Sequence, residues 1–271
     1  MNKKYQKFFN TVLDYYEKEG RPNLPWRKNP SPYRVVVSEI MLQQTQVERV
    51  ETFFNNWIKH FSNWKRLADA QQSEILKYWK GLGYNSRALR LHKLAQIVSR
   101  DYKGKLPQDY QSLVALPGIG PYTAGAILAF AYNTYVPFIE TNIRRVFIHH
   151  FFADRGNVSD AEIFEIIKKM GAIENPRIWY SALMDYGASL PKTLKQNPNK
   201  QSKHYSRQSS FKGSDREIRG KILDFLLKEK TLSQKKLFVK LGEEGGRYEK
   251  ILDQLEKEGF VFQTKNGVTL K

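Results

Sequence analysis

The segment Leu116–Ala126 constrains the fold most strongly, because it places a Pro-Gly-Ile-Gly-Pro turn between two apolar helical patterns. Gly118 and Gly120 let the backbone turn tightly and approach another molecule closely. The helix predicted after this turn begins with N–H groups that have no partner inside the helix, and such groups bind phosphate. A carboxylate, Glu140, follows in an apolar stretch. A phosphate-binding turn followed by such a carboxylate indicates chemistry on a nucleic acid.

The charge balance points to the same kind of partner. The 271 residues include 45 Lys+Arg and 27 Asp+Glu, which gives a formal net charge of +18. An excess of this size favours a polyanionic partner, and nucleic acid is the commonest one. The length allows two or three small domains, and a hydrophobic content of 41% supports apolar cores.

The absence of cysteine excludes several classes of site. Without thiolates the chain forms no disulfide, no thiolate-ligated zinc site and no thiolate-held iron–sulfur cluster. No stretch of 18 apolar residues is present, and the N-terminal segment lacks the apolar region of a signal peptide. We therefore expect an intracellular protein, cytoplasmic and associated with the nucleoid, that does not contact membranes.

Apolar residues follow helical spacing as far as residue 186. After a first helix near the N-terminus and a loop over 20–32, the pattern predicts helices over 35–54, 57–67, 73–79, 86–102, 111–116, 123–132, 142–152, 161–170 and 176–186. Residues 186–214 then contain six lysines and arginines and no acid. This composition indicates a basic loop, which is either a solvated linker or a segment that follows a DNA backbone.

Residues 215–271 have a separate pattern. The pattern predicts a helix over 218–226, a second helix that the N-cap signal Thr231-Leu232-Ser233 opens and that ends at 241, and a third helix over 248–258. A hairpin follows around Asn266-Gly267, a dipeptide that strongly favours hairpin turns. Three helices and a two-stranded wing indicate a winged helix-turn-helix, which binds DNA or a protein partner, and the net charge favours DNA. The third helix mixes acids with lysines, so we expect backbone contacts that add affinity rather than sequence readout.

Several separate motifs occur in the order found in the MutY branch of the helix-hairpin-helix base-excision glycosylases, which the chain resembles over about residues 24–214. They are Leu24-Pro25-Trp26-Arg27, Ser38–Val47, Gly81-Leu82-Gly83-Tyr84, Leu116–Gly120 and Met184–Ala188. The resemblance implies a two-lobed helix-hairpin-helix glycosylase domain over 1–214. Together with the winged helix-turn-helix domain expected over 215–271, this gives an all-α fold class. The resemblance also implies that a monomer hydrolyses an N-glycosidic bond in double-stranded DNA with a mismatch or lesion, after extruding the target base.

The resemblance assigns catalytic roles to four residues. Glu39 matches the general acid that protonates a purine nitrogen, and its apolar neighbours would raise its pKa as acid catalysis at neutral pH requires. Glu140 aligns with the second acid, which stabilises positive charge on the sugar, and Asn142 with the residue that orients it. Tyr122 stands where bifunctional relatives such as endonuclease III have a Schiff-base lysine, so a monofunctional enzyme is implied.

The resemblance also implies two groups of binding residues. Residues that enter the base stack or hold the DNA at the hairpin are Gln43, Gln44, Tyr84, Pro117, Gly118, Gly120 and Thr123. Residues that line the base pocket, or pack in a core instead, are Trp26, Arg27 and Tyr33. We expect no cofactor and no protein metal site. The resemblance leaves open whether a monovalent cation binds at the hairpin.

The chain departs from the family in three ways. Glu140 is one methylene longer than the usual Asp, and Thr141 replaces a usual Gly. No iron–sulfur loop follows Ala188, and the Nudix-like domain that reads 8-oxoguanine is replaced by the winged helix. We expect adenine opposite guanine or 8-oxoguanine to be the target. The alternatives are a glycosylase for thymine, uracil or an oxidised pyrimidine, and a non-catalytic DNA-binding regulator, against which the retention of Glu39 and Glu140 argues.

Overall fold

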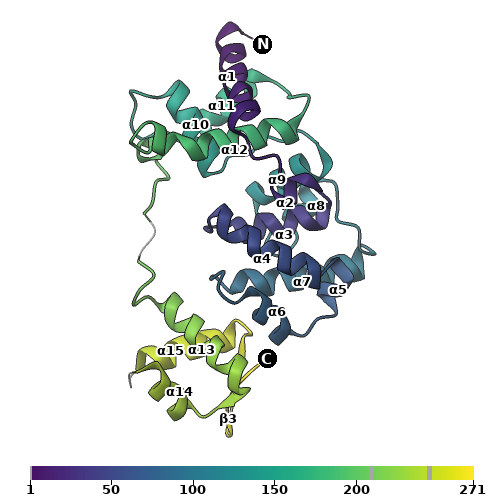
Figure 1. The fold of residues 1–271 in the computed structure, drawn as a ribbon, viewed down its shortest axis with the longest axis vertical. Coiled ribbons are helices and arrows are strands. Elements are labelled where there is room, and N and C mark those ends of the chain that lie inside the picture. The colour runs from purple at the N-terminus through teal and green to yellow at the C-terminus, as the bar shows by residue number, and fades with distance from the viewer. Residues whose placement is uncertain (1, 208–209, 243–245) are drawn as a thin grey trace. The chain divides into compact units, whose positions relative to one another are not determined.

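The computed structural model describes residues 2–207, 210–242 and 246–271, which are mostly helical (Figure 1). The chain divides into two compact units, one of Met1–Glu39 and Leu106–Arg207 and the other of Ile40–Lys105 and Gln208–Lys271. Each unit therefore joins segments that are distant in the sequence, and the boundary expected at residue 214 stays a prediction. Within the described ranges, no helix is long and apolar enough to cross a membrane.

The first unit is built from helices. They are α1 (Lys3–Glu19), α2 (Pro25–Lys28), most of α3 (Pro32–Leu42), α8 (Tyr110–Val114), α9 (Pro121–Tyr132), α10 (Thr141–Phe151), α11 (Asp160–Met170), α12 (Pro176–Thr193) and the short 3₁₀ helix η1 (Pro198–Gln201). Helices α10 and α12 lie side by side, and α1 packs on α12 (Figure 1). Phe8 of α1 meets Phe147 and Trp179 edge to face, with ring centroids 5.2 and 5.8 Å away. Aromatic packing of this kind fixes α10 in the unit.

A glycine allows α12 to approach the first turn of α10. A Cβ atom on Gly187 would lie 2.3 Å from the carbonyl oxygen of Asn142, closer than atoms can approach without a shift of backbone. Any larger residue at position 187 would push the two helices apart. The position of α10 therefore depends on Gly187.

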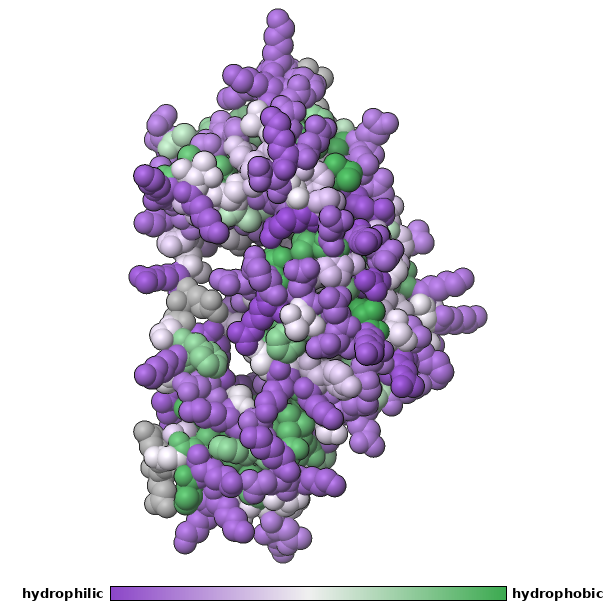
Figure 2. Space-filling model, viewed as in Figure 1, coloured by the Kyte–Doolittle hydropathy of each residue, from purple (hydrophilic) through white to green (hydrophobic). Residues whose placement is uncertain are grey.

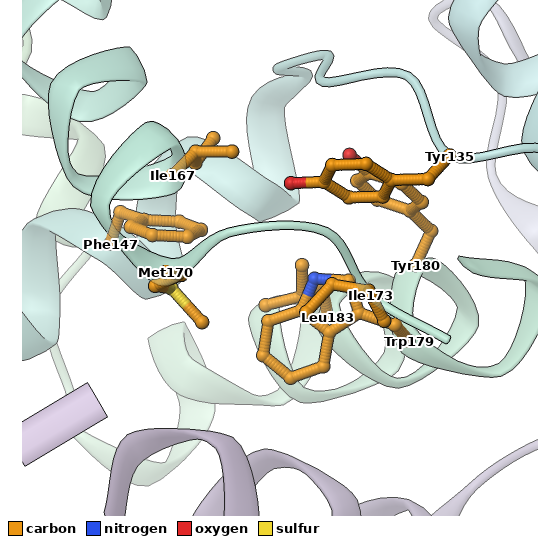
Figure 3. Close-up of a pocket in the computed structure, with 8 residues that line it drawn as sticks. All are labelled: Tyr135, Phe147, Ile167, Met170, Ile173, Trp179, Tyr180 and Leu183. Carbon is orange, nitrogen blue, oxygen red and sulfur yellow. The ribbon is translucent and has the colours of Figure 1, made fainter. Parts of the chain in front are cut away.

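A small cavity lies in this unit between α10, α11 and α12 (Figure 3). Its lining is aromatic and aliphatic and consists of Tyr135, Phe147, Ile167, Met170, Ile173, Trp179, Tyr180 and Leu183. The Tyr180 ring stacks on Phe138 at 4.0 Å between centroids, and its hydroxyl donates to the carbonyl oxygen of Val136 at 3.0 Å. The cavity holds no carboxylate and none of the predicted site residues, so it is a gap in the packing of an apolar core.

The second unit combines four helices of the first half of the chain with the C-terminal domain. Its elements are α4 (Val47–His60), α5 (Trp64–Ala68), α6 (Gln72–Trp79), α7 (Ser86–Asp101), α13 (Asp215–Glu229), β1 (Thr231–Leu232), α14 (Gln234–Leu241), α15 (Gly246–Lys257), β2 (Val261–Thr264) and β3 (Gly267–Leu270). The strands form an antiparallel sheet in the order β1-β3-β2, with Thr231 opposite Thr269 and Val261 opposite Leu270. The expected two-stranded wing thus gains β1 as a third strand.

The structure corrects two of the expected helices and the expected loop. The helix predicted over 35–54 breaks between α3 and α4, where Gln44 has a φ of 55°, and the one over 57–67 breaks before Asn63, which caps α5. The helices on both sides of each break bury apolar residues at helical spacing. The apolar pattern therefore continues across the break and does not mark it. The loop predicted over 186–214 begins later, since α12 continues to Thr193 through Pro191, and positions 208 and 209 lie outside the described residues.

The side chain of Arg87 stabilises the backbone where α3 ends and before α4 begins. This residue is 3% exposed, and its guanidinium donates to the carbonyl oxygens of Ile40 and Met41, both at 2.9 Å, and to that of Gln43. It also donates to the carbonyl oxygen of Gly83 at 3.0 Å. The last carbonyls of a helix have no partner inside the helix, and a cation there is also favoured by the helix dipole. Arg87 therefore ends α3 and ties it to the loop before α7.

We predict that Arg87→Met destabilises the protein by about 3–5 kcal/mol, because several buried carbonyls lose a charged donor. The measurement is the free energy of unfolding from urea titration. The matched control is Arg90→Met on the same helix, since Arg90 is exposed and donates to the carbonyl oxygen and the hydroxyl of Ser86, one turn away on its own helix. The control should cost no more than about 0.5 kcal/mol. Equal effects of the two substitutions would contradict this account of the break.

Candidate active site

Glu39 is a carboxyl group inside an apolar helix. It is 4% exposed, and its neighbours Val36, Val37, Ile40 and Met41 are buried as well. The hydroxyl of Tyr122, at the start of α9, donates to Glu39 Oε2 at 2.6 Å. A buried carboxyl group needs such a partner, because an isolated charge in an apolar environment is costly. The fold thus joins two predicted site residues that are 83 positions apart.

The surroundings of Glu39 change its acidity. Burial raises the pKa of Glu39 from 4.5 to about 7, and the charge of Glu140 adds to this effect, whereas the hydrogen bond from Tyr122 and the charge of Arg27 oppose it. Burial also raises the pKa of Tyr122 well above its ordinary value, so the phenol keeps its proton and acts as the donor. An acid with a pKa near neutrality can both hold a proton and give it up at physiological pH.

Glu140 is held in a different way. It is the N-cap of α10, and its Oε1 accepts from the backbone N–H groups of Asn142 at 2.6 Å and Ile143 at 2.9 Å. Burial raises the pKa of Glu140 above its ordinary value. These N–H donors and the charges of Arg145 and Arg144 oppose the rise and make it smaller. The N-terminus of a helix also favours a negative charge. The two acids therefore have unlike environments, Glu39 an apolar one and Glu140 one rich in donors.

A chain of hydrogen bonds leads from Glu140 to the segment after α12. Asn142 Nδ2 lies 3.4 Å from Glu140 Oε2, and Asn142 Oδ1 accepts from Arg145 Nη1 at 2.8 Å. Arg145 also donates to the carbonyl oxygen of Gly187 and, through Nε, to Asn197 Oδ1 at 3.0 Å. Asn199 Nδ2 donates to the carbonyl oxygen of Thr141 at 2.9 Å. The segment around η1 thus fixes the first turn of α10, where Glu140 lies.

The hairpin has the geometry that its glycines predict. Gly118 has a φ of 82°, and Gly120 is the N-cap of α9, with open space where a Cβ would be. Gly120 is exposed and Pro117 and Gly118 are partly exposed, whereas Thr123 is 3% exposed. Three of the hairpin residues expected to bind DNA, Pro117, Gly118 and Gly120, are therefore accessible, whereas the side chain of the fourth, Thr123, is buried.

The residues expected at the base pocket are buried or paired. Trp26 and Tyr33 are both buried. Arg27 Nη1 bonds to Asp185 Oδ2 at 2.7 Å, and Arg21 Nη2 bonds to Asp185 Oδ1 at 2.6 Å. Burial alone would raise the pKa of Asp185, but Arg27 and Arg21 hold it below its ordinary value. Arg27 therefore ties α2 to α12 in the first unit.

The residues expected to enter the base stack, Gln43, Gln44 and Tyr84, belong to the second unit. Gln44 and Tyr84 have φ values of 55° and 48°, a region that residues other than glycine rarely adopt. Arg87 joins the two loops, because it donates to the Gln43 carbonyl and lies over the Tyr84 ring at 5.4 Å from its centroid. Strained backbone of this kind is kept only where surrounding contacts hold it.

The motifs gave no role to Arg87, Arg145 or Asp185. One signal for Arg87 was available, because it occupies the apolar face of its helix together with Leu91, Leu94 and Val98 at helical spacing. A charged residue on such a face needs buried partners. Arg145 and Asp185 gave no comparable signal, since their partners lie far away in the sequence.

The chain does not fit the iron–sulfur cluster that the resemblance implies for this fold. Its 271 residues include no cysteine, so no thiolate is available after Ala188. Over residues 2–207, 210–242 and 246–271, no three His, Asp or Glu side chains gather into a group that could hold a metal ion. The segment that follows α12 forms η1 and is held by Asn197 and Asn199 instead.

Known proteins are similar to this chain in sequence and in fold. Residues 37–172 match the HhH-GPD superfamily of base excision DNA repair proteins. An adenine DNA glycosylase of Buchnera aphidicola from Acyrthosiphon pisum is 38% identical over 192 residues, which cover 69% of this chain but only 55% of that protein. An adenine DNA glycosylase of Mycolicibacterium smegmatis is 33% identical over 274 residues, with 94% of this chain and 93% of the relative covered.

A solved structure of a thermostable thymine-DNA glycosylase superposes with a TM-score of 0.63 at 27% identity, over 69% of this chain and 87% of that one. The sequence matches and this shared fold agree with the motifs around Glu39, Tyr122 and the hairpin. The chain therefore belongs to the HhH-GPD superfamily of base excision DNA repair proteins and, within it, to the adenine DNA glycosylase family.

Proposed function

We propose that this protein is a monofunctional DNA glycosylase that, as a monomer, removes adenine mispaired with guanine or 8-oxoguanine from double-stranded DNA. The observation that carries the proposal is the buried Glu39, which is hydrogen-bonded to Tyr122 and interacts electrostatically with Glu140, the N-cap of α10. The excess of 45 Lys+Arg over 27 Asp+Glu suits a DNA partner, and hydrophilic side chains cover most of the face drawn in Figure 2. The relatives named above are adenine DNA glycosylases.

The two acids divide the reaction between them. Protonated Glu39 gives its proton to a nitrogen of the adenine ring while the N-glycosidic bond breaks and its electron pair leaves with the base. The sugar becomes positively charged, and the carboxylate of Glu140 stabilises that charge. Water then adds to the anomeric carbon and loses a proton to the carboxylate left on Glu39. Unlike environments for two carboxyl groups are how one site supports both roles.

Tyr122 supports Glu39 and supplies no amine. Because a phenol cannot form an imine with the opened sugar, we propose that the enzyme does not cut the strand through a covalent Schiff base. Tyr122 instead gives the acid a fixed donor and orients it within the apolar helix.

A panel of duplexes tests the proposal. Each duplex carries one mispair or lesion, namely adenine, thymine, uracil or an oxidised pyrimidine, opposite guanine or 8-oxoguanine. We predict base release, detected as alkali-labile sites, from the adenine duplexes and no adduct trapped by borohydride. Release of pyrimidines alone would favour the thymine-type activity named for the solved relative. Good yields of a trapped adduct would contradict the monofunctional mechanism.

We predict that Glu39→Gln lowers the single-turnover rate of base release by about 10²–10⁴-fold, because the proton donor is lost while the shape is kept. The same substitution should stabilise the protein at alkaline pH. A buried carboxyl group whose pKa rises from 4.5 to about 7 on folding makes the native state less stable above that range. Glu39→Gln removes about 3 kcal/mol of this penalty at pH 8 and less than about 1 kcal/mol at pH 5.

The control is Glu48→Gln, the same change at an exposed position. It should alter neither the rate nor the pH dependence of the free energy of unfolding, measured by urea titration at pH 5 and pH 8. A Glu39→Gln variant that is inactive but no more stable at pH 8 would contradict the apolar environment assigned to Glu39.

We predict that Tyr122→Phe moves the alkaline limb of the pH–rate profile to higher pH. The hydrogen bond from Tyr122 lowers the pKa of Glu39, so its removal lets the acid keep its proton to a higher pH. The measurement is the single-turnover rate from pH 5.5 to 9. Tyr132→Phe is the control, since Tyr132 lies on the same helix but donates to the carbonyl oxygen of Leu106, and its profile should match the wild type. An unshifted limb in Tyr122→Phe would exclude this role.

A further inference from the structure

The C-terminal domain and residues 40–105 share one apolar core. Leu76 of α6 is 3% exposed and belongs to the same cluster as Ile222 and Leu226 of α13 and Phe260. Gln72 Nε2 donates to the carbonyl oxygen of Gly259 at 2.9 Å. A side chain shared between two segments in this way holds them together as one body. The winged domain is therefore attached to the part of the chain that contains Gln43, Gln44 and Tyr84.

Ion pairing adds to this attachment. Lys80, in the loop that leads to Tyr84, pairs with Asp224 of α13. Lys228 on the same helix approaches the other oxygen of Asp224 at 3.4 Å. The loop that contains Tyr84 is thus linked to α13 beside the shared apolar core.

Tyr84 itself is bound by the second residue of α13. Arg216 Nη1 donates to the Tyr84 hydroxyl, and the guanidinium lies 5.3 Å from the centroid of the Tyr84 ring. Arg87 lies 5.4 Å from the same centroid, so two cations hold one ring. Tyr84 also has a positive φ and follows Gly83, whose φ is 76°. A ring on such a strained loop keeps one direction only if its contacts hold it.

We propose that Arg216 is a positioning residue, through which the winged domain aims Tyr84 at the base stack beside an extruded nucleotide. The proposal rests on the proposed function, because Tyr84 acts as a wedge only in a protein that distorts DNA. The winged domain would then take part in base extrusion. Contacts between its own helices and the DNA backbone would only add affinity. Loss of the domain would remove Arg216 from Tyr84 and expose Leu76, so truncation would affect more than affinity.

The test follows unstacking of DNA rather than catalysis. A duplex carries 2-aminopurine next to an adenine mispair whose sugar has a 2′-fluoro group, so that the glycosidic bond is not cleaved. Insertion of Tyr84 unstacks the 2-aminopurine and increases its fluorescence. We predict that Arg216→Met lowers this increase about 3- to 10-fold, in keeping with the loss of one hydrogen bond and one cation–π contact.

A double-mutant cycle separates positioning from direct DNA binding. In a Tyr84→Ala background, Arg216→Met should have no further effect, because the residue that it positions is already missing. The control is Arg219→Met on the same helix, since Arg219 pairs with Glu258 and lies over Phe260. It should leave the fluorescence increase unchanged. Additive losses, together with a shallower dependence of affinity on salt, would mean that Arg216 binds a phosphate and would overturn the proposal.

A second variant keeps the test decisive if Arg216→Met unfolds. Tyr84→Phe leaves α13 untouched and removes only the hydroxyl that accepts from Arg216. Tyr84→Phe should lower the fluorescence increase. A signal equal to that of the wild type would overturn the proposal. Tighter DNA binding by Tyr84→Phe or Arg216→Met would overturn it as well. A wild-type protein that unstacks DNA in an Arg216-dependent way but releases no base would contradict the proposed function and leave this inference standing.

Discussion

The burial of one carboxyl group, Glu39, is the constraint on which the candidate site depends. Its neighbours on α3, Val36, Val37, Ile40 and Met41, are buried, and the Tyr122 hydroxyl donates to its carboxyl group. This environment shifts the pKa of Glu39 to about 7 and makes the folded state less stable at high pH. A chain selected for stability alone would place an apolar residue there. The surrounding structure has to offset this loss, and the paired Asp185 and the buried Arg87 are among the contacts that fix the elements around α3.

Backbone N–H donors, as well as burial, set the position and the environment of the second acid, Glu140. Glu140 caps α10, a position where Ser, Thr, Asp and Asn are preferred and a longer acid is unusual. Its extra methylene is accommodated because the N–H groups of Asn142 and Ile143 converge on one oxygen. The other oxygen makes a long contact with Asn142 Nδ2, at 3.4 Å. An arrangement that satisfies one carboxylate oxygen firmly leaves the second better placed to face a positive charge.

The motifs predicted the family and the helical class, because glycines and apolar spacing are local features. The catalytic roles of Glu39 and Glu140 stay a prediction. The motifs did not predict the break at Gln44, the continuation of α12 through Pro191 or the third strand β1. Those features depend on partners far away in the chain, such as Arg87 for the first break and β3 for β1. Local spacing carries no information about such partners, and the link between Arg216 and Tyr84, 132 positions apart, is the clearest case.

The segment after α12 shows how this chain fixes the first turn of α10 without thiolates. A metal cluster would hold such a segment through a few strong bonds, whereas here the same task is shared by many weaker ones. Asn199 bonds to the carbonyl of Thr141, Asn197 to Arg145, and Lys203 pairs its backbone N–H with the carbonyl of Val158 at 2.9 Å. Each net hydrogen bond contributes only about 1 kcal/mol. Several are needed, and all but one of these bonds end on the first two turns of α10. The position of Glu140 is thereby set by neutral amides and one guanidinium, groups that are insensitive to oxidation and to metal supply.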